Sequence, residues 1–135
     1  MATDTADRRR STRPQVIVVA DDYEAARSLW GLWLTQLGFD VIEATTGAEA
    51  LVRTEQHNPR VILMDLGMPV MDGLEATRRL KEDPRTAGVP VVMVTAYASD
   101  QHRRAAEQAG CAAFLAKPAD LDELLAVLRR VLAQT

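Results

Sequence analysis

The chain has 135 residues, which is enough for one domain around a single core and too few for two. Its net charge of −3 creates no overall field that attracts nucleic acid or an anionic membrane, so direct DNA binding and membrane association are not expected. A lone cysteine, Cys111, excludes an internal disulfide bond and is typical of a reducing, cytoplasmic environment. No apolar run is long enough to cross a bilayer.

The first 14 residues differ in composition from the rest. They are mostly polar and include four arginines, at positions 8, 9, 10 and 13. They also lack the apolar stretch of a signal peptide. We therefore predict a disordered tail over residues 1–14 and one folded domain over residues 15–135.

From residue 15 onward, short apolar runs alternate with helical patterns. The apolar runs predict strands at 16–20, 40–44, 61–64, 91–95 and 113–116. The segments between and after them predict helices at 23–37, 46–56, 72–81, 99–109 and 121–133. Five strands alternating with five helices predict an α/β fold, in which helices cover both faces of a doubly wound parallel sheet.

Helix boundaries are marked by local signals. The segment Thr46–Glu49 has the pattern of a capping box, and Asp120 with Glu123 has the same spacing before the last helix. Gly38 and Gly110 follow two helical patterns, where a glycine commonly ends a helix. In the last helix, five leucines recur at helical spacing and predict its buried face: Leu121, Leu124, Leu125, Leu128 and Leu132.

Polar residues end or directly follow four of the predicted strands. They are the pair Asp21–Asp22, then Asp65, Thr95 and Lys117. Ligands of parallel α/β sheets bind outside the carboxyl ends of the strands, so we expect these side chains to converge there. Like charges about 4 Å apart repel by roughly 1–4 kcal/mol between water and a protein surface, so three carboxylates together favour a bound cation. Mg²⁺, or Mn²⁺, with oxygen ligands fits this need.

This set of groups suits phosphoryl transfer, which depends mainly on positioning and charge neutralisation. A carboxylate can act as the covalent nucleophile. The central position of the third strand favours Asp65 as the acceptor, while the adjacent pair Asp21 and Asp22 suits metal binding. Lys117 would pair with one phosphoryl oxygen as a point charge, and the Thr95 hydroxyl would donate a hydrogen bond to another.

The motifs carry a resemblance to a known family. The acidic pair Asp21–Asp22, the run from Met64 to Gly73 around Asp65, the pair Thr95–Ala96 and the pair Lys117–Pro118 occur in the order and spacing of response-regulator receiver domains of two-component phosphorelays. The resemblance covers about residues 15–133. It implies a flavodoxin-like receiver fold with strand order 2-1-3-4-5.

The resemblance also implies roles for single residues. Asp65 would accept the phosphoryl group from a phosphohistidine. Asp22, Asp65 and the backbone carbonyl of Gly67 would bind the metal, with Asp21 acting largely through water. The Lys117–Pro118 peptide bond is expected to be cis, which is accessible mainly before proline.

The same resemblance implies a switch and its partners. Thr95 moves toward the phosphoryl group and the aromatic Phe114 turns inward, which changes a surface formed by strand five and the last two helices. The donor would be a sensor histidine kinase or a histidine phosphotransfer protein. Output would pass to a separate protein, because no segment for an output domain follows residue 133. The chain is then a phosphoacceptor switch and not an enzyme, beyond self-phosphorylation and autodephosphorylation, and a monomer or weak homodimer.

Other functions remain possible on the sequence alone. An aspartyl hydrolase of the haloacid-dehalogenase type would need a second aspartate two residues after the nucleophile, where this chain has Gly67. A flavodoxin-like cofactor binder would need a phosphate loop in place of Asp21 and Asp22. A phosphorylation-independent adaptor would not need all five site residues.

The first helix carries more large apolar residues than one buried face requires. They include Trp30 and Leu32, and we expect one of these two side chains to be exposed. It is either an isolated surface residue or part of a docking patch for the phosphoryl donor.

Overall fold

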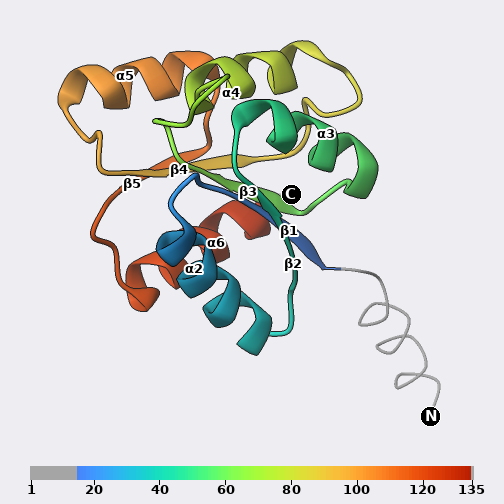
Figure 1. The fold of residues 1–135 in the computed structure, drawn as a ribbon, viewed down its shortest axis with the longest axis vertical. Coiled ribbons are helices and arrows are strands. Elements are labelled where there is room, and N and C mark those ends of the chain that lie inside the picture. The colour runs from blue at the N-terminus through green and yellow to red at the C-terminus, as the bar shows by residue number, and fades with distance from the viewer. Residues whose placement is uncertain (1–14, 135) are drawn as a thin grey trace.

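A parallel sheet forms the centre of the molecule in the computed structural model, which describes residues 15–134 (Figure 1). Its strands are β1 (Val16–Ala20), β2 (Asp40–Ala44), β3 (Val61–Met64), β4 (Val91–Thr95) and β5 (Ala113–Ala116). All four strand pairs are parallel, and the order is β2-β1-β3-β4-β5. The predicted α/β fold and its strand order are thereby confirmed. The tail predicted over residues 1–14 lies outside the described residues.

Five helices connect or follow the strands. They are α2 (Glu24–Gln36), α3 (Gly47–His57), α4 (Gly73–Glu82), α5 (Asp100–Ala109) and α6 (Leu121–Ala133). Figure 1 shows α3, α4 and α5 on one face of the sheet and α2 and α6 on the other. Each face has its own hydrophobic cluster, because alternate side chains of a strand point to opposite faces. None of the helices in residues 15–134 has the length and hydropathy needed to cross a membrane.

Burial follows the place of each strand in the sheet. Every residue of β1, β3 and β4 is buried, since these strands have neighbours on both sides and helices on both faces. The edge strand β2 buries only Ala44. A rigid, apolar centre therefore fixes the carboxyl ends of β1, β3 and β4, where the polar residues of interest follow.

The capping signals have two different outcomes. Asp120 and Glu123 form a complete capping box at the start of α6. At α3, Thr46 caps the helix by accepting the Glu49 amide, but the Glu49 carboxylate accepts the amide and hydroxyl of Thr45 instead of the Thr46 amide. The predicted box at α3 is thus only half formed, because the carboxylate reaches one residue further back. These two hydrogen bonds hold the pKa of Glu49 below its ordinary value.

Two predictions about helix faces are also resolved. In α2, Trp30 is buried and Leu32 is 56% exposed. In α6 the buried residues are Leu124, Leu128 and Val131. The leucine pattern is therefore right at Leu124 and Leu128, whereas Leu121, Leu125 and Leu132 are only partly buried. Of these three, Leu132 packs against the core cluster, and the fully buried stripe continues from Leu128 through the valine three residues later.

Candidate functional site

Three carboxylates gather at the carboxyl edge of the sheet. Asp21 follows β1 and Asp65 follows β3, and these strands are neighbours in register. The Asp65 amide donates to the carbonyl of Ala20 (2.8 Å), which continues the ladder one residue beyond β3. Carboxylate oxygens of Asp21, Asp22 and Asp65 lie within 4.8 Å of one another. The adjacency of β1 and β3, fixed by the crossover topology, is what brings residues 44 positions apart into one cluster.

Asp21 is the most constrained of the three. Its Oδ1 accepts the amide of Tyr23 (2.9 Å), and its Oδ2 accepts Lys117 Nζ (2.5 Å). Its own amide donates to the carbonyl of Ala44 at the end of β2 (3.0 Å). Burial raises the pKa of the Asp21 carboxyl, and the hydrogen bond from Lys117 opposes that rise. Asp22, by contrast, is exposed at the rim of the cluster.

Lys117 is the amine of the site. Its Nζ lies 2.5 Å from Asp21 Oδ2 and 3.5 Å from Asp65 Oδ2. Its backbone amide donates to the carbonyl of Thr95 (2.9 Å), and the Lys117–Pro118 peptide bond is cis. One amine therefore faces three carboxylates, so the cluster keeps an excess of negative charge.

Thr95 and Phe114 stand apart from this cluster in their contacts. Thr95 is fully buried at the end of β4, and its Oγ1 accepts the backbone amide of Tyr97 (3.1 Å). Phe114 pairs with Met93 across β4 and β5, and the guanidinium of Arg103 lies 4.6 Å from the centre of its ring. A cation over an aromatic face is an attractive contact. The phenyl ring is therefore held between the sheet and α5.

The loop after β3 is shaped by glycine and by one strained residue. A side chain at Gly67 would overlap the ring of Tyr97, so the bare backbone of Gly67 lets that ring pack against it. The Met71 amide donates to the Pro69 carbonyl (2.7 Å), which closes a γ-turn around Val70 at φ 68°. A β-branched residue rarely adopts this left-handed conformation. Val70 is also 91% exposed, so tight packing does not explain the turn.

Two more glycines allow the backbone of the same loop to contact the first residues of two helices. A Cβ at Gly73, the first residue of α4, would overlap the backbone oxygen of Asp65. A Cβ at Gly47, the first residue of α3, would overlap the backbone oxygens of Met71 and Asp72. The loop that carries Asp65 is therefore in direct backbone contact with the starts of both helices.

The donor set fits a hard divalent cation. Three clustered carboxylates offer the oxygen ligands that Mg²⁺ and Mn²⁺ prefer. One of the three is exposed, which leaves a path for a hydrated ion. The remaining negative charge, after the single amine of Lys117, is of the sign that such an ion neutralises.

Sequence reasoning missed three contacts around this site. Arg27 donates to the backbone of Asp21, Tyr97 covers Gly67, and Arg103 stacks on Phe114. Arg27 lies one helical turn beyond the acidic pair, which is the signal that could have indicated it. The other two contacts each join residues of different elements, and no local pattern marks them.

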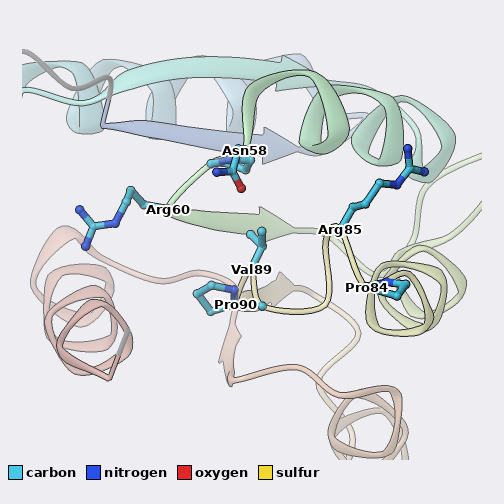
Figure 2. A pocket seen from close by; sticks show the side chains of 8 residues that line it. Asn58, Arg60, Pro84, Arg85, Val89 and Pro90 are labelled. Carbon is cyan, nitrogen blue, oxygen red and sulfur yellow. The ribbon is translucent and has the colours of Figure 1, made fainter.

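A separate hollow of about 360 Å³ lies at the opposite, amino edge of the sheet (Figure 2). It is lined by Asn58, Pro59, Arg60, Pro84, Arg85, Gly88, Val89 and Pro90. Figure 2 shows the side chains of Arg60 and Arg85 pointing away from each other. Both are already engaged, Arg60 with the side chain of Gln15 and Arg85 with Asp83 and Glu55. This hollow therefore does not form a clamp for an anion.

The fold and the acidic edge together define the class of a flavodoxin-like phosphoacceptor domain. Residues 17–129 match the response regulator receiver domain, so the chain belongs to that family. It is thus a receiver domain of a two-component system, and its aspartate cluster fits Mg²⁺ binding and aspartate phosphorylation.

Known relatives agree with this assignment. The chain is 31% identical over 119 residues to the polar-differentiation response regulator DivK of Brucella anthropi, covering 88% of this chain and 97% of that protein. It is 34% identical to the DNA-binding dual master transcriptional regulator RpaA of Synechocystis, covering 90% of this chain but 50% of that protein.

A solved structure is similar in fold and sequence. The receiver domain of the sensor histidine kinase PA1611 from Pseudomonas aeruginosa superposes with a TM-score of 0.82 at 32% identity, covering 89% of this chain and 98% of that one. That structure has a magnesium ion coordinated in its active-site cleft.

Proposed function

We propose that this chain is a stand-alone, cytoplasmic response regulator that accepts a phosphoryl group on Asp65. The donor is a phosphohistidine of a sensor kinase or a histidine phosphotransfer protein. The output is a change in the surface formed by β5, α5 and α6, which is read by a separate protein and not by DNA. The chain acts as a monomer or weak homodimer, and its only chemistry on its own is self-phosphorylation from small donors and autodephosphorylation.

One observation carries this proposal. The Asp65 carboxylate lies in a cluster with two other carboxylates and 3.5 Å from a lysine amine, at the carboxyl edge of a parallel sheet. A structural role alone does not account for this arrangement, because clustered carboxylates raise the free energy of the folded state.

Asp22, Asp65 and the backbone carbonyl of Gly67 would hold the metal ion, with Asp21 acting largely through water. When bound, the ion neutralises the carboxylates and the charge that develops on the transferring phosphoryl group. Asp21 orients the site, since its carboxylate and backbone are held by Tyr23, Ala44 and Lys117.

The transfer itself needs little covalent machinery. A carboxylate oxygen of Asp65 attacks phosphorus, an O–P bond forms, and the N–P bond to the donor imidazole breaks. The electron pair of that bond stays on the imidazole nitrogen. Lys117 then pairs with a phosphoryl oxygen, for which it must move its Nζ from Asp21 toward Asp65.

Thr95 and Phe114 form the switch. The Thr95 hydroxyl accepts a hydrogen bond from Tyr97, so its own proton is available to donate to a phosphoryl oxygen. Charged hydrogen bonds contribute about 1.5–3 kcal/mol each. Two new ones, from Thr95 and Lys117, give about 3–6 kcal/mol, which is comparable to the roughly 5.5 kcal/mol that moves a two-state population from 1:99 to 99:1. Phe114 then turns inward and alters the surface of β5 and α5.

A groove beside the site offers a surface for the donor. It has a volume of about 430 Å³ and a largely apolar lining, to which both Lys117 and residues of α2 contribute. Leu29 is 43% exposed there and Trp30 forms part of the wall. We propose that the donor docks on this groove, so that truncation of the exposed Leu29 (Leu29→Ala) slows transfer from a phosphohistidine more than labelling by a small donor. Equal effects on both would refute this docking role.

The phosphoacceptor assignment is tested with a small donor. Wild type and Asp65→Asn are incubated with acetyl phosphate and Mg²⁺, and their intact masses are measured. We expect a phosphate-sized gain in wild type only, which is lost when the ion is removed with a chelator. Asp40→Asn is the matched control, because Asp40 is an exposed aspartate at the start of β2, on the opposite edge. A gain in Asp65→Asn, or in no variant, would contradict the assignment.

A further inference from the structure

Arg27 links three segments around the acidic cluster. It lies in the first turn of α2, and its side chain is 15% exposed. Its Nη1 donates to the backbone carbonyl of Asp21 (3.0 Å), and its Nε donates to Glu43 Oε1 (3.0 Å). Glu43 belongs to β2, so one guanidinium joins the β1–α2 loop, the first turn of α2 and the edge strand.

The contact with Asp21 determines the orientation of a peptide plane. The carbonyl of Asp21 and the amide of Asp22 belong to one planar unit, so fixing the oxygen fixes the plane. The preceding unit is held as well, because the Asp21 amide donates to Ala44. Asp22 therefore leaves the strand in a defined direction, although its own side chain is exposed.

Arginine is suited to this role and lysine is not. The guanidinium presents several donors in a rigid plane, so Nε and Nη1 can serve a carboxylate and a carbonyl at the same time. A lysine amine is a single point on a flexible stem. The Arg27 side chain is 15% exposed and that of Glu43 is 52% exposed, so the guanidinium is packed against the protein and is not free in solvent.

We propose that Arg27 is a positioning residue of the metal site, which holds the Asp22 carboxylate in place through the Asp21–Asp22 peptide. The inference depends on the metal site proposed above. It adds a residue that touches neither the ion nor the phosphoryl group. Its contribution to metal binding is conformational.

The charge of Arg27 and its positioning role have opposite effects on the affinity for Mg²⁺. A positive charge near three carboxylates repels an incoming cation, so Coulomb's law alone predicts that removing Arg27 tightens Mg²⁺ binding. Loss of positioning predicts that removing it weakens Mg²⁺ binding. The sign of the change in affinity therefore separates the two effects.

The test is a titration of the metal-free protein with Mg²⁺ by calorimetry, comparing wild type, Arg27→Met and Arg53→Met. Arg53 is the matched control, since both arginines act electrostatically on Glu49 but only Arg27 contacts the Asp21 backbone. We expect the Kd of Arg27→Met to rise about tenfold, as is common when a residue that orients metal ligands is lost. We expect the Kd of Arg53→Met to stay equal or fall slightly.

Two further readouts exclude a merely structural effect. Hydrogen exchange of the Asp22 amide in the metal-free protein should be faster in Arg27→Met than in wild type. At saturating Mg²⁺, Arg27→Met should still gain a phosphate from acetyl phosphate, because Asp65 is intact. Arg27→Lys, which keeps the charge and one donor, should show an intermediate Kd and serves if the methionine variant does not fold.

The outcomes distinguish this inference from the proposed function. An unchanged or lower Kd in Arg27→Met, or in Arg27→Lys where only that variant folds, overturns the positioning role and leaves the phosphoacceptor proposal standing. A wild type that binds no Mg²⁺ overturns both. An equal rise in Kd for Arg53→Met also overturns the role, because it would assign the effect to long-range changes and not to the contact with Asp21.

Discussion

The carboxyl and amino edges of the sheet both carry a hollow and several charged side chains, but they balance their charges differently. At the carboxyl edge three carboxylates face one amine. At the amino edge Arg85 is paired with two carboxylates, Asp83 and Glu55, and is largely exposed. Concavity alone therefore does not separate a functional site from an ordinary surface. The unbalanced charge separates the two, because the excess negative charge at the carboxyl edge can be neutralised only by a ligand of opposite sign.

The two edges also differ in backbone strain, and the strained residue lies at the edge with the unbalanced charge. Among residues 15–134 two non-glycine residues have positive φ, Asn58 at the amino edge and Val70 at the carboxyl edge. Asn58 ends α3 in the left-handed conformation that asparagine accepts readily. Val70 is a β-branched residue in a γ-turn, with no such tolerance. Strain and unbalanced charge thus occur together, as is typical of functional sites.

The largest expected effect comes from removing the amine at the carboxyl edge. Lys117→Met should lower the free energy of unfolding of the metal-free protein by about 3 kcal/mol, because it leaves the buried Asp21 carboxylate without its partner. Mg²⁺ should restore part of the loss by supplying positive charge. Urea denaturation with and without Mg²⁺ measures both. If Lys117→Met is as stable as wild type without metal, the carboxyl edge does not carry an excess of negative charge.

Removing one carboxylate from the same edge should have the opposite sign. Asp65→Asn should raise the free energy of unfolding of the metal-free protein by about 2 kcal/mol, since it relieves repulsion within the cluster. The gain should shrink when Mg²⁺ is added. At the amino edge Asp83→Asn should destabilise the protein, because Asp83 is paired with Arg85. If both variants shift stability in the same direction, the contrast between the edges is wrong.

Relief of strain should have a smaller effect. A left-handed conformation at Val70 costs about 2 kcal/mol, and glycine loses about 1 kcal/mol in extra chain entropy, so Val70→Gly should gain about 1 kcal/mol. Asn58→Gly is the control and should change stability little. Thermal denaturation of both variants measures the difference. A loss of stability in Val70→Gly would show that the turn is not strained.

The smallest effect is expected at Arg85. Arg85→Gln should lower stability slightly at low salt and leave phosphorylation of Asp65 unchanged, because Arg85 is exposed. Hydrogen bonds from Arg85 lower the pKa of Asp83 from its ordinary 3.8, so this pair stabilises the fold above that pH. The difference between wild type and variant should therefore disappear as the pH falls below 3.8. A difference that persists in acid would assign it to packing.

The sequence predicts most of the fold because its signals are local. Apolar runs such as Val16–Ala20 mark buried strands, and Gly38 and Gly110 adopt the positive φ that ends a helix. The residues at the carboxyl edge were predicted for the same reason, since each directly follows a strand. Spatial convergence of Asp21, Asp22, Asp65 and Lys117 then follows from the parallel topology.

The sequence does not predict the particular contacts that long side chains make. The Glu49 carboxylate bonds Thr45 and not Thr46, and Arg103 lies over Phe114. Lys117 lies closer to Asp21 than to Asp65, a preference that the sequence does not indicate. These choices depend on differences of about an ångström in three dimensions, which residue spacing does not record.

The glycines at the starts of α3 and α4 give the carboxyl edge a mechanical property. Gly47 and Gly73 place helix backbone directly on the loop that begins at Asp65, with no side chain between them. A flexible side chain between loop and helix could absorb a small displacement of the loop by changing its rotamer. Without one, a movement of the Asp65 backbone acts directly on the start of α4, and a movement of Met71 or Asp72 acts directly on the start of α3. A change at one carboxylate can therefore displace two helices on the same face of the sheet.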